Sequence, residues 1–480
     1  MTPNIAGLVI AILAATARIS GAQAPSAPQA PPAASAASAA RYESDPYEFA
    51  ASDSVTHDIR LSRVADGVRF TWPRTAAPWD TALLAVRSWG AEQDPWVEVS
   101  VGKFRIQQYL DTNAVGVRWL NLSGLRERMA GGSEVIIRTH AVTLEAEAAT
   151  LRLFDNHLDL QQRILVIAPH PDDAEIAAFG LYADRQASVV TVTAGNAGEM
   201  NYRASVSDPA EHYSLKGYLR AVDSVTIPWQ GSIPPERTAN LGYFDGRLDA
   251  MYLAPKQTLP EVYGANTDVA RYRRANLSKL VSGAARSNTW QHLVEDLGEV
   301  PRKVNPGMVV MPDPRLDMHP DHEFTSVALD QALAQWGGNP MFLLYTNHTD
   351  ADQYPYGPSG TVVSLPPGER HVSVQKIYSH PTAPALQIRK LFAMESMHDL
   401  RLSPDEQITC SSATIAHRPD YPRAPEEDYF RRAPRANELF FLINKAGVRA
   451  VIQDFLAHYD VRCGSRHAIR AASTLSLTRF

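Results

Sequence analysis

Hydrophobic and polar residues alternate in two different ways along the chain. Between residues 43 and 157, short segments rich in Val and aromatic residues are separated by Gly, Asp and Pro, most clearly at 67–72, 96–104, 115–120 and 133–154. Alternation with a period of two, interrupted by turn residues, is typical of antiparallel strands with one buried face. The pattern therefore predicts a small β-sandwich-like domain over residues 43–157.

From residue 160 onward the pattern changes to nearly continuous apolar runs separated by helical periodicity. The runs predict strands at 163–169, 187–195, 307–314 and 341–347. The intervening segments predict helices over 173–186, from near Glu323, and over 384–397. Strands that are apolar on both faces and alternate with helices belong to covered parallel sheets. Residues 160–405 therefore predict an α/β domain with a Rossmann-like, mostly parallel sheet and helices on both faces.

Two further segments carry weaker patterns. The stretch 200–300 contains one predicted helix at 215–225 and a turn at 241–249, which predicts an insertion that shapes a cleft above the sheet. Residues 406–480 contain one apolar strand at 438–443 and predict a loop-rich appendage.

The first 42 residues predict export. Residues 4–17 form an apolar run of signal-peptide length, and Ala22-Gln23-Ala24 fits a small-x-small cleavage site, so we expect a signal peptide over 1–24. No Lys or Arg precedes Arg18, so the usual basic start is missing, and an uncleaved anchor is the alternative. Residues 25–42 are rich in Pro, Ala and Ser and predict a disordered linker. The expected location is periplasmic or secreted.

Composition narrows the classes of partner. The formal net charge of −6 gives no electrostatic reason to expect nucleic acid. No later segment is long and apolar enough to predict a transmembrane span. The two cysteines, Cys410 and Cys463, can pair in an oxidising compartment or stay unrelated thiols, and their spacing does not decide.

The ends of two predicted strands carry residues that can bind a metal ion. His170, Asp172 and Asp173 follow the first strand of the α/β region, and His319 and His322 follow the third. The carboxyl ends of parallel strands meet at one edge of a sheet, so the two clusters can be neighbours. Together they offer imidazoles and carboxylates for a three-ligand site with an open position, as a catalytic zinc requires.

Each cluster also has an explanation without catalysis. His, Pro and Asp suit turns, an Asp at a helix start caps the helix, and histidines three apart can lie on a solvated first turn. Two such clusters, each after a buried strand, nevertheless favour a catalytic site.

Three segments together resemble the LmbE/PIG-L family of zinc-dependent de-N-acetylases: APHPDDAEI at 168–176, TVTAGNAGE at 191–199, and MPDPRLDMHPDH at 311–322. The resemblance covers residues 160 to about 350. It implies removal of the acetyl group from an N-acetylglucosaminyl unit. It says nothing about the β-rich domain or about the last 75 residues.

The resemblance also implies roles for individual residues. His170, Asp173 and His322 would bind Zn²⁺ or another divalent metal, and Asp172 would be the general base. His319 would stabilise the oxyanion as a cation or protonate the leaving nitrogen. The residue types suit these roles, because two imidazoles and one carboxylate leave room for an acidified water. Whether Asp172 or His319 delivers the last proton stays open.

Positions outside this set are also matched to the family. Arg220 falls where members often place an arginine that holds sugar hydroxyls, and Asp245 matches a recurring aspartate, so the resemblance implies substrate binding for both. Surface salt bridges are the alternative for each. Asn196 stands where the family commonly has a glutamate, and Asp317 where some members carry a tyrosine. Other histidines are interpreted as structural or surface residues: His348, His380 and His398.

These observations predict metal-dependent hydrolysis of the acetamide of an N-acetylhexosamine unit in an exported or cell-surface glycan. N-acetylglucosamine is the favoured sugar. A small glycoside or glycolipid is an alternative substrate. A non-haem Fe(II) oxygenase also uses two histidines and one carboxylate, and a non-catalytic glycan-binding protein is the alternative outside enzymes. The sequence gives no indication of the oligomeric state.

Overall fold

The computed structural model describes residues 44–459, except 46, 51–53, 76–77, 92–93, 113, 350–353, 369–370 and 401–428. The predicted signal peptide and linker lie outside the described residues, as do Cys410 and Cys463. Within the described part of the chain, no helix combines the length and the apolar character needed to cross a membrane.

The amino-terminal part consists of antiparallel strands. Their bounds are β2 Val55–Arg60, β3 Ser62–Val64, β4 Gly67–Thr71, β5 Thr81–Trp89, β6 Trp96–Val101, β7 Phe104–Tyr109, β8 Gly116–Asn121, β9 Glu134–His140, β10 Thr143–Leu144 and β11 Ala148–Phe154, with a 3₁₀ helix η1 at Ser123–Arg128. One sheet has the order β10-β5-β11-β2 with β8 paired to β5, and the other has the order β3-β4-β9-β6-β7. Alternate residues of both sheets, including Val68, Leu84, Val99 and Leu151, are buried in one cluster.

Tryptophans contribute to this core. Trp72 and Trp79 are buried in it, as expected if the rings fill the interior rather than bind glycan. Trp119 is buried in another cluster, which also contains Leu165 and Ile167. Trp89 is 52% exposed.

A larger sheet follows, with seven strands: β12 Ile164–Ala168, β13 Ala187–Thr193, β14 Thr238–Tyr243, β15 Met308–Pro312, β16 Met341–Tyr345, β18 Lys376–Pro381 and β19 Asn437–Ile443. Their order is β14-β13-β12-β15-β16-β19-β18. The pairings from β14 through β16 are parallel, whereas β19 is antiparallel to both of its neighbours. Two short strands, β1 Tyr47–Phe49 and β17 Val372–Val374, pair separately. The predicted α/β class is confirmed.

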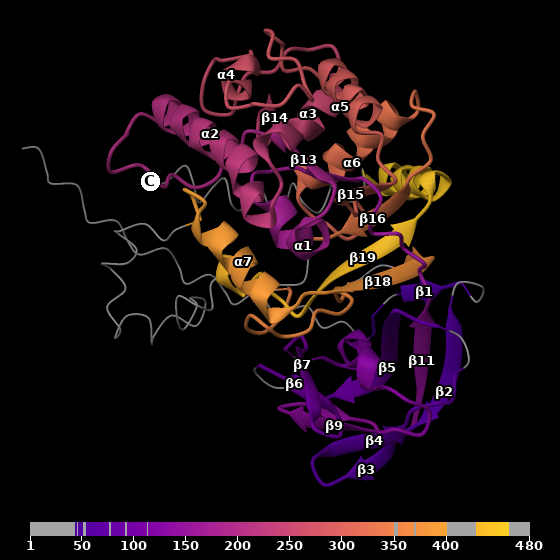
Figure 1. The fold of residues 1–480 in the computed structure, drawn as a ribbon. Helices are drawn as coiled ribbons and strands as arrows, with labels where there is room; N and C mark the ends of the chain where they lie inside the picture. The colour runs from indigo at the N-terminus through magenta and orange to yellow at the C-terminus, as the bar shows by residue number, and fades with distance from the viewer. Residues whose placement is uncertain are drawn as a thin grey trace, which may run out of the picture. The chain divides into compact units, whose positions relative to one another are not determined.

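The helices are α1 Asp173–Tyr182, α2 Pro209–Thr226, α3 Leu248–Leu253, α4 Ala270–Arg273, α5 Trp290–Val304, α6 Pro320–Leu333, α7 Pro384–Glu395 and α10 Tyr429–Arg432, with 3₁₀ helices η2 Ile227–Gly231 and η3 Pro235–Arg237. Residues 445–459 are also helical. Helix α1 packs against α7 and against β18 and β19, and α6 packs against α5 and β15 (Figure 1).

The buried strand β12 explains why helices lie on both faces. Ile164, Val166 and Ala168 share a core cluster with residues of α1 and α7. Leu165 and Ile167, which point the other way, share a cluster with residues of α5 and α6. A strand that is apolar on both faces needs such cover on each side.

Two strands correct the sequence interpretation. Residues 200–300 were predicted to form an insertion above the sheet, but they supply its edge strand, β14. The sequence of this strand, TANLGY, contains polar residues and gives little strand signal. Residues 406–480 were predicted to form an appendage, yet β19 from this segment lies between β16 and β18. The other predicted domain boundaries stay predictions.

Candidate metal centre and active site

Three predicted metal-binding atoms meet beyond the carboxyl ends of β12 and β15. His170 Nδ1 lies 3.1 Å from His322 Nε2 and 3.2 Å from Asp173 Oδ2. His322 Nε2 lies 3.0 Å from Asp173 Oδ2. All three side chains are buried. Asp173 is the first residue of α1 and His322 lies in the first turn of α6, so two strand-to-helix turns bring the three atoms together.

The spacing of these atoms fits a zinc-sized ion. A triangle with sides near 3.1 Å has its corners about 1.8 Å from its centre (3.1/√3). Zinc binds His nitrogen and carboxylate oxygen at about 2.0–2.2 Å, so an ion just above this triangle would reach all three atoms. The donor set of two imidazoles and one carboxylate is also one that zinc uses in catalytic sites.

The surroundings of His322 favour a positive charge at this point. His322 donates its Nδ1–H to Asp317 Oδ2 at 2.9 Å, which leaves Nε2 directed at His170 and Asp173. Burial disfavours the charged imidazole, but the carboxylates of Asp173 and Asp317 outweigh burial and raise the pKa of His322 to about 10. A site that holds a proton this strongly is also suited to a metal cation.

His170 is oriented in the same way by acids on its outer side. Its Nε2 lies 3.3 Å from Asp321 Oδ2 and 3.4 Å from Asp245 Oδ1. With the Nε2 proton directed at these carboxylates, the Nδ1 lone pair faces Asp173 and His322. Carboxylates that fix the tautomer of a ligand histidine are a common feature of metal sites. Asp245, predicted to bind substrate, therefore lies against His170.

Asp172 occupies a strained position beside the three donor atoms. Its φ of 142° is one that L residues rarely adopt, and such strain costs about 1–3 kcal/mol. Arg220 Nη2 holds the turn by donating to Asp172 Oδ2 at 3.0 Å and to Pro171 O at 2.8 Å. Burial raises the pKa of Asp172 to about 7, although Arg220 lowers it. A carboxylate with this pKa can accept and return a proton near neutral pH.

Arg220 lies between two acids. Besides Asp172, it binds Asp399 Oδ2 through Nη1 at 2.8 Å, and Lys216 Nζ lies 3.3 Å from the same oxygen. The Arg220 side chain is 13% exposed. Its described contacts orient Asp172, and the predicted contact with sugar hydroxyls stays a prediction.

His319 differs from the expected cation. Its Nδ1 accepts the backbone N–H of Asp321 at 3.2 Å and therefore carries no proton. Burial, together with the neighbouring His170 and His322, lowers the pKa of His319 well below its usual value. His319 is thus a neutral imidazole whose Nε2–H can donate a hydrogen bond.

A comparison with known families agrees with this geometry. Residues 165–333 match the PIG-L family, described as GlcNAc-PI de-N-acetylase. This segment is a PIG-L domain. The match spans β12 to the end of α6 and includes every residue predicted for the site. The match of this segment supports a de-N-acetylase activity.

Solved structures show weaker similarity. The A40926 pseudoaglycone deacetylase Dbv21 is 19% identical, with 59% of this chain and 98% of that chain covered and a TM-score of 0.33. The 4-carboxy-2-hydroxymuconate hydratase GalB from Pseudomonas putida KT2440 is 12% identical, with 59% and 95% covered and a TM-score of 0.27. No curated protein sequence matches the chain. The family assignment therefore rests on the PIG-L match.

The candidate site also includes residues that the sequence interpretation missed, and two of them lie beyond the end of the PIG-L match. Asp317 Oδ2 accepts the backbone N–H of Asn347 at 3.0 Å, and Asn347 Nδ2 donates to Asp173 Oδ1 at 2.7 Å. The ring of His348, interpreted as structural or surface, lies 4.9 Å from that of His322. Asn347 and His348 follow β16 almost directly, so the strand-end argument, applied to every strand, would have found them.

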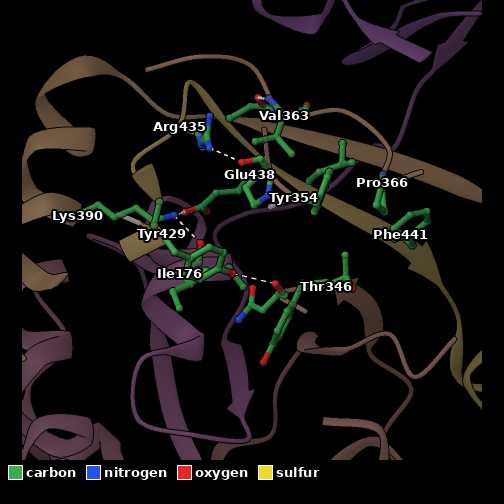
Figure 2. A pocket seen from close by; sticks show the side chains of 17 residues that line it. Ile176, Thr346, Tyr354, Val363, Pro366, Lys390, Tyr429, Arg435, Glu438 and Phe441 are labelled. Atoms are coloured by element: carbon green, nitrogen blue, oxygen red, sulfur yellow. Dashed lines mark hydrogen bonds and ion pairs between the residues drawn. The ribbon is translucent and has the colours of Figure 1, made fainter. Parts of the chain in front are cut away.

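A small cavity lies next to helix α1, near the candidate site. It has a volume of about 60 Å³ and is bordered by Ile176 of α1, Asn347, Lys390 and Glu438, among others. The Tyr429 hydroxyl donates to the main-chain oxygen of Asn347 at 2.9 Å, and Figure 2 shows the Lys390 ammonium between Ile176 and Glu438. None of the side chains of His170, Asp173 and His322 lines the cavity.

Proposed function

We propose that this protein is a metal-dependent N-deacetylase that hydrolyses the acetamide of an N-acetylhexosamine unit. The observation that carries the proposal is the meeting of His170, Asp173 and His322 within 3.2 Å, with Asp172 and His319 beside them. The PIG-L match supports the reaction class. Zinc is the proposed ion, because its usual bond lengths fit the spacing of the donor atoms.

His170, Asp173 and His322 would hold the ion, which when bound supplies an acidified water and polarises the amide carbonyl. Asp172 accepts a proton as the water oxygen attacks the carbonyl carbon. The His319 Nε2–H donates a hydrogen bond to the oxygen that gains negative charge. The carbon–nitrogen bond then breaks and the amine nitrogen takes the proton from Asp172. The products are acetate and a hexosamine unit whose amine is free.

The substrate and the location are parts of the same proposal. N-acetylglucosamine is favoured because the matching family is described by that sugar. The signal-peptide pattern of residues 1–24 supports an exported enzyme, and an exported enzyme meets cell-wall and surface glycans. We therefore propose a polysaccharide, peptidoglycan or glycolipid as the substrate rather than a cytoplasmic glycoside.

Acetate release tests this function. The metal-stripped protein, with and without added Zn²⁺, is assayed on chitooligosaccharides, peptidoglycan fragments and N-acetylglucosamine itself. We expect zinc-dependent acetate release that is faster on oligosaccharides, and a loss of about 10²–10⁴-fold in Asp172→Asn. Asp184→Asn, which changes an exposed acid paired with Arg389, is the matched control. Release by Asp172→Asn at the parent rate would refute the mechanism, and equal rates on monomer and oligomer would refute the polymer substrate.

A further inference from the structure

Helix α1, whose first residue is Asp173, is interrupted in its middle. Ala178 has φ −141° and ψ 16°, which are not helical values. In a continuous α-helix the N–H groups of Gly180 and Leu181 would bond the carbonyls of Ile176 and Ala177. Here both N–H groups donate instead to the carboxylate of Glu438, at 2.8 and 2.9 Å. The interruption therefore leaves backbone groups that need other partners.

Lys390 binds a backbone group on the other side of the break. Its Nζ donates to the carbonyl of Ile176 at 2.7 Å and to Glu438 Oε1 at 2.9 Å. The Glu438 carboxylate thus accepts hydrogen bonds from the two free N–H groups, and the Lys390 ammonium donates one to a free carbonyl. The two side chains also form an ion pair with each other. Figure 2 shows the Lys390 ammonium bridging Ile176 and Glu438. An ion pair has replaced a helical hydrogen bond.

The Lys390 and Glu438 side chains are both buried, and Gly180 of α1 leaves space for the Glu438 carboxylate. Lys390 and Glu438 are 1% and 4% exposed. A side-chain carbon at Gly180 would lie 3.1 Å from Glu438 Oε2 and 2.9 Å from Thr382 Oγ1, so glycine is what permits this close approach. His380 Nε2, 3.2 Å from the carbonyl of Gly180, pairs a further backbone group near the break.

The position of the break connects the ion pair to the metal-binding residues. Only five residues, 173–177, separate the start of α1 from the break, and this short turn carries Asp173. Such a turn is too short to be stable alone, so its direction depends on what holds its far end. Lys390 holds Ile176, at that far end. Lys390 on α7 and Glu438 on β19 both lie outside the PIG-L match.

We propose that Lys390 and Glu438 are positioning residues for the metal site: they fix the first turn of α1 and thereby set the place of Asp173. The proposal rests on the proposed function, because it assumes that Asp173 binds the ion. Segments beyond the PIG-L domain would then be required for a fully formed metal site.

Zinc affinity is the readout that separates positioning from general stability. The full chain, stripped of metal, is titrated with Zn²⁺ against a chromophoric chelator, as parent, Lys390→Met, Glu438→Gln and Gly180→Ala. Gly180→Ala keeps both ions but crowds the side chains of Glu438 and Thr382 against the helix. We expect affinity to fall about 10–100-fold in each variant, the range typical of residues that orient metal ligands. Hydrogen exchange at residues 180 and 181 should accelerate at the same time.

The control is another buried ion pair far from α1 in sequence. Arg118 donates to both carboxylate oxygens of Asp111, at 2.8 and 2.9 Å, in the β-rich part. Asp111→Asn should lower the urea midpoint but leave zinc affinity unchanged. Unchanged affinity in folded Lys390→Met and Gly180→Ala would overturn the inference, as would an equal loss in Asp111→Asn. If the parent binds no zinc, or if His322→Ala binds zinc as tightly as the parent does, the proposed function is wrong. This inference, which rests on that function, is then wrong as well.

Discussion

Replacing Arg220 by methionine tests whether this residue orients the base or binds the sugar. In the structure Arg220 gives one hydrogen bond to Asp399 and two to the turn at 171–172. Methionine fills much of the same space but leaves Asp172 without its cation. The structural account therefore predicts a defect in the chemical step.

The expected magnitudes follow from these contacts. Breaking a buried ion pair by removing one partner costs about 3–5 kcal/mol. Lys216 remains 3.3 Å from Asp399, so only Asp172 loses its partner. We therefore expect Arg220→Met to lower the free energy of unfolding by about 3 kcal/mol. Misplacing a catalytic group by about 1 Å costs about 10²-fold, so kcat should fall by that factor while KM stays nearly constant.

Urea unfolding and steady-state acetate release measure the two effects. Arg220→Lys keeps the charge but not the forked geometry, so it should recover most of the stability and only part of kcat. Arg389→Met is the control, because Arg389 pairs with the exposed Asp184. This substitution should lower the free energy of unfolding by less than about 1 kcal/mol. A raised KM with unchanged kcat in Arg220→Met would refute the positioning role and favour a contact with the sugar.

Three further results are expected. Chelation should abolish acetate release and Zn²⁺ should restore it; activity that survives complete removal of metal would exclude this mechanism. His319→Gln should lower kcat about 10²-fold without changing zinc affinity, measured by the same titration, and weaker zinc binding would instead make His319 a ligand. Burial lowers the pKa of His380 to about 4, so the unfolded chain takes up the proton first as pH falls. Between pH 6.5 and 4 the parent should lose about 3 kcal/mol of stability, just below the limit of about 3.5 kcal/mol that 2.5 pH units at about 1.4 kcal/mol each would set. Urea titrations measure this loss, and His380→Gln should lack it.

The meeting of His170, Asp173 and His322 could be predicted from the sequence because all three lie within short motifs. His170 and Asp173 belong to one strand-to-helix turn, and His322 follows another buried strand. Parallel strands end at a common edge, so local patterns were enough to place the two turns together.

Long-range partners could not be predicted in the same way. Asp399 reaches Arg220 across 179 positions, and Glu438 reaches Gly180 across 258. Nothing in the residues around either acid indicates the partner. The contact of Asp399 depends on where the chain lies after α7, and that of Glu438 depends on where β19 enters the sheet. The neutral state of His319 was missed for a similar reason, since it results from burial beside two other imidazoles.

The most direct test of the account is to locate the ion itself. Anomalous diffraction from crystals grown with Zn²⁺ should place one strong zinc peak about 2.0–2.2 Å from His170 Nδ1, Asp173 Oδ2 and His322 Nε2. A peak bound by other residues, or none there at saturating zinc, would contradict the claim that these three side chains form a catalytic metal site.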